Sequence, residues 1–199
     1  MSLVLIRHGK SVWNLENKFT GWYDIELAPE GVLEAEKASA SLIENDFKPD
    51  VCFTSYLQRA NKTLEIILKH MPVKFIQNVE IKKSWKLNER HYGALQGLNK
   101  DDTKQKYGDE QFLEWRRSYN TPPPVLEEES PMNPRNDPIY KNENKNELPL
   151  TECLKDTYER VVPYWDNEIK PLAAEKNVLI AAHGNSLRAL CKYLFNIQD

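Results

Sequence analysis

Short apolar runs mark the strands that the sequence predicts. One covers residues 3–6, and short, mainly apolar segments at 50–55 and 177–182 predict two more strands; each of the three is followed by a polar or charged turn. Short apolar runs bounded by turns are typical of strands buried on both faces of a parallel sheet. Residues 73–75 and 79–81 are weaker strand candidates. The pattern therefore predicts a largely parallel sheet.

Amphipathic segments between these runs predict helices. Pro29 suits the first turn of one helix, and Glu152 and Asp156 favour the first turns of another that begins at Thr151. The predicted helices cover residues 29–45, 58–69, 101–107, 110–119, 151–169 and 185–195. Because strands and helices alternate, we expect an α/β fold, a three-layer sandwich whose mostly parallel central sheet has helices on both faces. The length of 199 residues predicts a single domain over residues 1–199.

Two segments break the alternation of strands and helices. Residues 85–97 are rich in charged and aromatic side chains and are expected to form a loop. Residues 121–149 hold more than half of the prolines, which are excluded from helix interiors and central strands. Connections of this length usually cover another part of a domain. The sequence thus predicts a long, Pro-rich excursion at about 121–149.

Composition and charge narrow the functional classes. The 27 basic and 30 acidic residues give a net charge of -3, so we expect no nucleic acid and no membrane as partner. The apolar run before Arg7 is too short for a signal peptide or a membrane span. Three scattered cysteines show no metal-ligand or redox spacing, which favours reduced thiols, a cytoplasmic location and no metal.

Two predicted strands end in the same kind of turn, a histidine followed by a glycine. His8-Gly9 follows the first strand, and His183-Gly184 follows the last. In an open parallel sheet both turns lie at the carboxyl edge, where ligands bind. The helix that follows Asn185 directs free N–H groups and its positive dipole end toward the same edge. An anion is the natural ligand.

Neutral imidazole near pH 7 is a nucleophile that can carry a phosphoryl group. Guanidinium groups suit the oxygens of such a group, and the sequence offers several near the predicted edge: Arg7, Arg59, Arg90, Arg116 and Arg117. The alternative for His8 is a hydrogen-bonded histidine that caps a strand, and the bare Arg-His-Gly tripeptide does not exclude it. Two His-Gly turns with arginines nearby favour a phosphoryl site without specifying the reaction.

Longer motifs carry a resemblance to a known family. They are Arg7-His8-Gly9, Ser11-Val12-Trp13-Asn14, Phe19-Thr20-Gly21-Trp22, the block from Leu87 to Lys100, Trp115-Arg116-Arg117-Ser118-Tyr119 and Ala182-His183-Gly184-Asn185-Ser186-Leu187-Arg188. These closely resemble the 2,3-bisphosphoglycerate-dependent phosphoglycerate mutases of the histidine phosphatase superfamily. The match runs from Leu3 to about Asn196, and the fourteen-residue block from Leu87 is its most specific part.

The resemblance implies roles for individual residues. His8 would be the phosphohistidine, Glu89 the proton donor and acceptor, and His183 the partner that stabilises the transferring group. Arg7, Arg59 and Asn14 would hold the phosphoryl oxygens. The residues implied to bind the phosphoglycerate are Thr20, Gly21, Arg90, His91, Tyr92, Lys100, Arg116, Arg117, Gly184 and Asn185. The residues alone do not single out Glu89, since a surface ion pair with Arg90 would explain it equally.

The resemblance also implies an activity. The enzyme would be an isomerase of glycolysis and gluconeogenesis that interconverts 3-phosphoglycerate and 2-phosphoglycerate, primed by 2,3-bisphosphoglycerate and needing no metal. A homodimer or homotetramer would be possible. A bisphosphoglycerate synthase or phosphatase, and a phosphate-ester binder with a weakened active site, are the alternatives. Ser11 and the Thr20-Gly21 pair favour the mutase branch.

Two features depart from the family pattern. Lys10 stands where the family usually has glutamate, and an ammonium there is expected to strengthen phosphate binding and slow its release. Family members also continue beyond the position of Asp199 with a last strand and a mobile tail that helps to close the site. Without such a tail, hydrolysis of the phosphohistidine is expected to compete with isomerisation.

Overall fold

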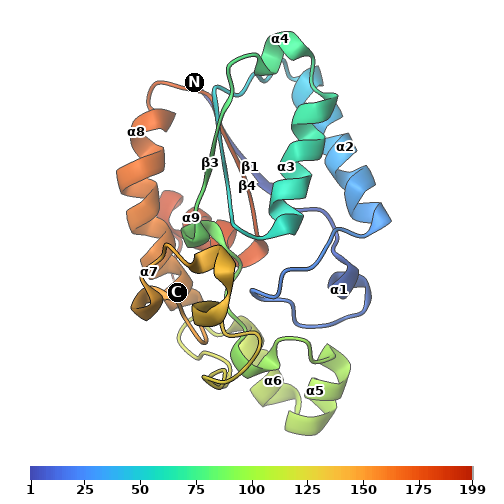
Figure 1. The fold of residues 1–199 in the computed structure, drawn as a ribbon, viewed down its shortest axis with the longest axis vertical. Helices are drawn as coiled ribbons and strands as arrows, with labels where there is room; N and C mark the ends of the chain where they lie inside the picture. Colours follow the sequence, from blue (N-terminus) through green and yellow to red (C-terminus); the bar gives the residue numbers. More distant parts are fainter. Residues whose placement is uncertain (199) are drawn as a thin grey trace.

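The computed structural model describes residues 1–198, which contain a four-stranded parallel sheet (Figure 1). The strands are β1 (Leu3–Arg7), β2 (Val51–Thr54), β3 (Glu80–Lys83) and β4 (Val178–Ala182), in the order β1-β4-β2-β3. Each neighbouring pair is parallel, and the register places Arg7 beside Ala182. The predicted α/β fold with a parallel sheet is confirmed.

Helices cover both faces of this sheet. On one face lie α2 (Pro29–Glu44) and α3 (Gln58–His70), and on the other lie α7 (Leu154–Tyr164), α8 (Lys170–Ala173) and α9 (Gly184–Leu194) (Figure 1). Along β4, Leu179 packs with the first layer, whereas Val178 and Ile180 pack with the second. All three are fully buried, as expected when successive side chains of a strand point to opposite covered faces.

The loops and short elements beyond the carboxyl ends of the strands form a second part of the structure. They include α1 (Val12–Leu15), α5 (Lys100–Tyr107), α6 (Asp109–Arg117) and the short 3₁₀ helices Trp85–Leu87 and Gly93–Leu95 (Figure 1). Residues 121–149 contain three further 3₁₀ turns, Pro134–Asn136, Pro138–Tyr140 and Lys145–Glu147. Tyr140 and Leu148 anchor this excursion by packing against Trp22 and Trp85.

Several predicted elements differ in the structure. Residues 73–75, a strand candidate, belong to the helical turn α4 (Val73–Ile76), which follows Pro72 and leaves Val73 exposed. The predicted strand 79–81 is β3 at Glu80–Lys83. The predicted helix 151–169 begins only at Leu154 and becomes a π-helix at Trp165–Ile169. Pro163 inside α7 and Pro171 at the start of α8 flank the π-helix, and each lacks the N–H of a regular α-helical bond.

None of the helices described within residues 1–198 is long and apolar enough to cross a membrane.

Candidate active site

A cavity of about 210 Å³ lies at the carboxyl edge of the sheet. Strand ends, the start of α9 and the loops beyond the sheet supply its walls. The residues that line it are Arg7, His8, Asn14, Lys18, Phe19, Thr20, Gly21, Arg59, Glu89, Tyr92, Lys100, Arg116, Arg117, Gly184, Asn185 and Arg188. Thirteen of the sixteen site residues expected from the sequence are among them; His183, Arg90 and His91 are not.

The parallel pairing of β1 and β4 brings the two histidines together. The His8 backbone N–H donates to the carbonyl of Ala182 over 2.9 Å, which continues the β1–β4 ladder by one residue. The ring centroids of His8 and His183 are consequently 4.9 Å apart. His183 is fully buried behind His8, so it borders the reacting histidine without lining the cavity.

His8 is held as a neutral nucleophile. Burial, with the positive charges of Arg59 and Arg7 beside it, lowers the pKa of His8 to about 3. Its Nδ1 lies 2.6 Å from the carbonyl oxygen of Gly9, which can only accept, so the ring proton resides on Nδ1. The lone pair is therefore on Nε2, and that atom is the one able to attack phosphorus.

His183 is neutral for the same reason, and a serine sets its tautomer. Burial and the charge of Arg59 hold the pKa of His183 well below its usual value. The Ser55 hydroxyl accepts from the Leu57 N–H over 3.1 Å and lies 2.7 Å from His183 Nε2. Because these two atoms are its hydrogen-bond partners among the described residues, we assign the hydroxyl proton to the contact with Nε2. The ring proton of His183 then lies on Nδ1, a buried donor without a protein partner in the described residues. This Nδ1–H, on a ring whose centroid is 4.9 Å from that of His8, is therefore a donor available to an acceptor that enters the site.

Replacing Ser55 should therefore impair catalysis more than binding. In Ser55→Ala the His183 ring loses the contact that fixes its tautomer, so kcat for phosphoryl transfer should fall between about 10-fold and 10⁴-fold, the upper figure being the loss when a catalytic histidine is held in the wrong tautomer. KM should change little, because Ser55 does not line the cavity. Steady-state kinetics with Ser55→Thr, which retains the hydroxyl, provide the control. An unaltered kcat in Ser55→Ala would contradict this role.

Arg59 organises the cavity wall formed by the loop at Gly21. It is 1% exposed, and its terminal nitrogens donate to the carbonyls of Gly21 (2.7 Å) and Tyr23 (3.0 Å). Its Nε is buried and has no protein partner. Gly21 has a φ of +54°, and a Cβ there would collide with the side chain of Gln96. A glycine is thus required where Arg59 clamps this loop, and the loop closes one side of the cavity.

Most of the remaining wall is positively charged. Lys100 begins α5, Arg116 and Arg117 end α6, and Arg188 lies one turn into α9. Burial and the nearby charges of Arg116 and Arg7 lower the pKa of Lys100. Because these positive charges repel one another, the cavity favours the binding of a polyanion.

Glu89 is the one carboxylate among the residues that line the cavity. It is 9% exposed, and its Oε1 accepts from the backbone N–H groups of Arg90 (2.8 Å) and Asn185 (3.0 Å). Asn185 is in the first turn of α9, whose dipole favours a negative charge at this point. The carboxylate is therefore fixed at the cavity surface, where it can exchange a proton with a bound hydroxyl.

The structure does not place Arg90 or His91 in the cavity, in contrast to the expectation. The Arg90 guanidinium is buried, donates to the carbonyls of Trp115 (3.0 Å) and Glu152 (3.3 Å), and stacks on Tyr92. His91 is fully buried, and its Nδ1 accepts from the Gly93 N–H over 3.0 Å. Both side chains are buried among these partners and do not line the cavity.

Sequence reasoning missed Lys18, Phe19 and Arg188 as lining residues, and Ser55 as a contact of His183. The sequence could have predicted Arg188 at the site, since it follows Gly184 by four residues and so lies on the same helix face. Its Nη1 donates to Asn185 Oδ1 over 3.2 Å. Lys10, expected to act on phosphate, is exposed and does not line the cavity.

Three buried histidines should make the fold sensitive to mild acid. The pKa of His8 and of His91 is lowered to about 3, and that of His183 lies well below 6.5, so the folded chain leaves these rings neutral. In the unfolded chain each ring binds a proton below about pH 6.5, so the unfolded state binds more protons and stability falls as pH drops.

The free energy of unfolding should therefore decrease between pH 7 and pH 5 by up to about 1.4 kcal/mol per pH unit for each buried histidine. Urea unfolding at several pH values measures this slope. It should be smaller in His91→Gln, which removes one of the three buried rings. A free energy of unfolding that stays constant between pH 7 and pH 5 would contradict the neutral state of the buried rings.

Within residues 1–198, no group of three or more His, Cys, Asp or Glu side chains is arranged to hold a metal ion.

Comparison with known proteins places this site in a family. Residues 3–199 match the model of the histidine phosphatase superfamily, branch 1. Among solved structures, a mycobacterial glucosyl-3-phosphoglycerate phosphatase is similar with a TM-score of 0.71 and 21% identity, over 98% of this chain and 81% of that one. A phosphoglycerate mutase from Bacillus anthracis str. Sterne is similar with a TM-score of 0.67 and 20% identity, over 98% and 79%. With a family match over nearly its whole length, this chain belongs to the histidine phosphatase superfamily, whose members are phosphoryl-transfer enzymes.

Proposed function

We propose that this enzyme interconverts 3-phosphoglycerate and 2-phosphoglycerate through a phosphohistidine at His8. The observation that carries the proposal is the charge of the cavity. Seven cationic side chains line it against one carboxylate, Glu89: they are Arg7, Lys18, Arg59, Lys100, Arg116, Arg117 and Arg188. A single phosphate needs far fewer partners, so the site suits a substrate with at least two anionic groups.

A phosphoglycerate meets this requirement with its phosphate and its carboxylate. Arg7 and Arg59 adjoin His8 and suit the transferring phosphoryl group, because they can neutralise charge on its oxygens. Lys100, Arg116 and Arg117 come from the α5–α6 side of the cavity and suit the second anionic group. This division would orient the substrate hydroxyl between His8 and Glu89.

The residues support a two-step transfer. In the first step Glu89 takes the proton of the substrate 2-hydroxyl, whose oxygen attacks phosphorus, and the bonding electrons return to His8 Nε2. In the second step His8 Nε2 attacks the other phosphate, and the departing 3-oxygen takes the proton from Glu89. The His183 Nδ1–H would donate to a phosphoryl oxygen in both steps. Each proton and electron pair is returned, as an isomerisation requires.

The same cavity fits a priming bisphosphate. 2,3-Bisphosphoglycerate, when bound, supplies the phosphoryl group that charges His8. Its greater negative charge matches the excess of cations, and the unpartnered buried Nε of Arg59 and Nδ1 of His183 are donors that would gain acceptors. The chain's own residues would then hold the second phosphate while His8 is charged.

Conversion of 3-phosphoglycerate to 2-phosphoglycerate, coupled to enolase, tests the proposal. The assay is run with and without catalytic 2,3-bisphosphoglycerate, and phosphate release is followed in parallel. Isomerisation stimulated by the bisphosphate is the expected result. Its absence, with the protein folded and His8 able to be phosphorylated, would contradict mutase activity.

Phosphatase activity is the second candidate function, because the solved structures of similar fold include phosphatases as well as a mutase. In that case water, in place of a second substrate hydroxyl, would attack the phosphohistidine, with Glu89 taking its proton. Phosphate release without 2-phosphoglycerate in the same assay would favour a phosphatase. One experiment thus separates the two candidates.

A further inference from the structure

A buried ion pair lies behind the cavity wall and has no role in the steps above. Arg160 of α7 donates from Nε to Glu152 Oε1 over 2.6 Å and from Nη2 to Oε2 over 3.0 Å. The two side chains are 7% and 3% exposed, whereas every other ion pair described within residues 1–198 has at least one exposed partner. Burying such a pair rarely adds stability over a well-packed apolar pair, so a positional role is the better explanation.

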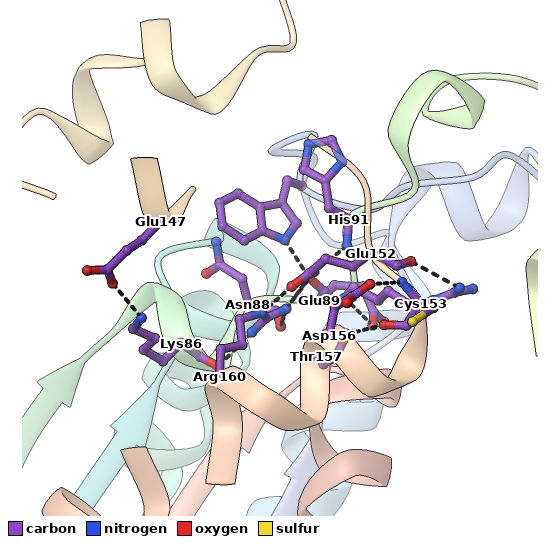
Figure 2. A network of polar contacts seen from close by, with 12 residues as sticks. Lys86, Asn88, Glu89, His91, Glu147, Glu152, Cys153, Asp156, Thr157 and Arg160 are labelled. Atoms are coloured by element: carbon purple, nitrogen blue, oxygen red, sulfur yellow. Dashed lines mark hydrogen bonds and ion pairs between the residues drawn. The ribbon is translucent and has the colours of Figure 1, made fainter. Parts of the chain in front are cut away.

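The pair directs its remaining bonds at one loop. Arg160 Nη2 also donates to the carbonyls of Asn88 (3.0 Å) and Glu89 (2.9 Å), and its Nη1 donates to that of Lys86 (2.6 Å). Glu152 Oε2 accepts from the backbone N–H of His91 over 2.7 Å. Figure 2 shows these two side chains meeting beside the loop that carries Glu89. The backbone is therefore held on both sides of Glu89 by the same ion pair.

Other contacts also hold this segment, but most of them act on the side chains beside Glu89. The Asn88 amide accepts from the Tyr56 N–H (3.0 Å) and donates to the Tyr140 hydroxyl (2.9 Å), and the Arg90 guanidinium donates to backbone carbonyls.

The Glu89 carbonyl also accepts from the Trp22 indole, and the side-chain carboxylate accepts from Arg90 and Asn185 at the cavity. A shift of the loop would move the carboxylate away from the α9 N-terminus, whereas the His8 side chain itself is placed by β1 and its pairing with β4.

We propose that Glu152 and Arg160 are positioning residues that keep the Glu89 carboxylate at proton-transfer distance from the reacting oxygen. This inference rests on the role of Glu89 in the proposed function. It separates the reaction into a part that needs the pair and a part that does not. Attack of His8 Nε2 on phosphorus needs His8 and the arginines, whereas departure of a basic alkoxide oxygen also needs a proton from Glu89.

The leaving group of the phosphate ester distinguishes these parts. When His8 Nε2 bonds to phosphorus, the P–O bond breaks and its electron pair goes to the ester oxygen. In p-nitrophenyl phosphate that oxygen leaves as a stable phenolate without a proton. In 2,3-bisphosphoglycerate, the ester that charges His8 in the proposed function, the alkoxide oxygen must take the Glu89 proton as it leaves. A loop displacement of about 1 Å should cost about 10²-fold for the second ester, with much less effect on the first.

The experiment measures phosphorylation of His8 by each ester under single-turnover conditions. The p-nitrophenol burst reports the first ester, and quenched intact mass spectrometry reports phosphohistidine from the second. Two variants are compared with wild type. Arg160→Lys retains the positive charge but not the bidentate guanidinium, and Glu152→Gln retains the size of the side chain but not its charge. Arg135→Lys is the control, because Arg135 also joins a glutamate, Glu128, to a backbone carbonyl at a remote place. Thermal unfolding confirms that each variant is folded.

Loss of about 10²-fold with 2,3-bisphosphoglycerate and less than about threefold with p-nitrophenyl phosphate, in either folded variant and not in Arg135→Lys, supports the inference. Equal losses with both esters, or no loss, would overturn it. Failure of the proposed function would be seen separately. The variants would still lose phosphorylation selectively with the ester that needs a proton, but wild type would release phosphate without forming 2-phosphoglycerate.

Discussion

His8→Ala should abolish phosphoryl transfer. The variant removes the one histidine among the described residues that line the cavity, because His183 lies behind it with Nε2 against Ser55. Loss of a covalent nucleophile costs about 10⁴-fold or more in kcat. Isomerisation coupled to enolase and phosphate release should both fall to background, and intact mass spectrometry should detect no added phosphoryl group after incubation with 2,3-bisphosphoglycerate.

His70→Ala is the matched control for this loss. His70 ends α3, its Nε2 is 3.8 Å from the exposed Glu36 carboxylate, and it does not border the cavity. Its replacement should leave both activities unchanged. Substantial turnover by His8→Ala would mean that phosphate is transferred without a histidine intermediate, and the proposed route through His8 would be wrong.

The sequence predicts the frame of the site well because that frame depends on local patterns. Apolar runs fix β1 and β4, and the histidine after each run is carried to the same edge by parallel pairing. The helix after His183 follows from the same reasoning. These features need no knowledge of distant contacts, so the family match from residue 3 to residue 199 and the four-stranded parallel sheet agree with them.

Features that depend on tertiary packing could not be predicted in this way. Arg90 and His91 lie within the most specific motif, yet they face away from the cavity because Glu152 and backbone carbonyls of α6 hold them there. Ser55 is an unremarkable residue after β2 until the β2–β4 pairing brings it to His183. The apolar side chains near Val73 suggested a strand, but Pro72 begins a helical turn on the surface. The direction of side chains in loops is thus what the sequence pattern could not predict.

Glu89→Gln should separate proton transfer from binding. The amide oxygen of glutamine can accept from the Arg90 and Asn185 N–H groups as Oε1 does, so the loop should retain its position. What is lost is a group able to take and return a proton. Isomerisation of 3-phosphoglycerate should therefore fall by about 10²-fold to 10⁴-fold in kcat, the usual contribution of general acid–base catalysis. KM should change little, or decrease, because a negative charge beside the anionic substrate is removed.

The dependence on the attacking or leaving group makes this prediction specific to proton transfer. In Glu89→Gln, the rate of His8 phosphorylation by p-nitrophenyl phosphate should stay within about threefold of the wild-type rate, because the phenolate leaves without a proton. Glu127→Gln, an exposed carboxylate in the excursion, should match wild type in both assays. If Glu89→Gln lost both esters equally, Glu89 would be needed for binding or for the fold, and the proton would have to be carried by another group. Among the residues that line the cavity no second carboxylate could replace it, so such a result would direct attention to the neutral imidazole of His183 or to water.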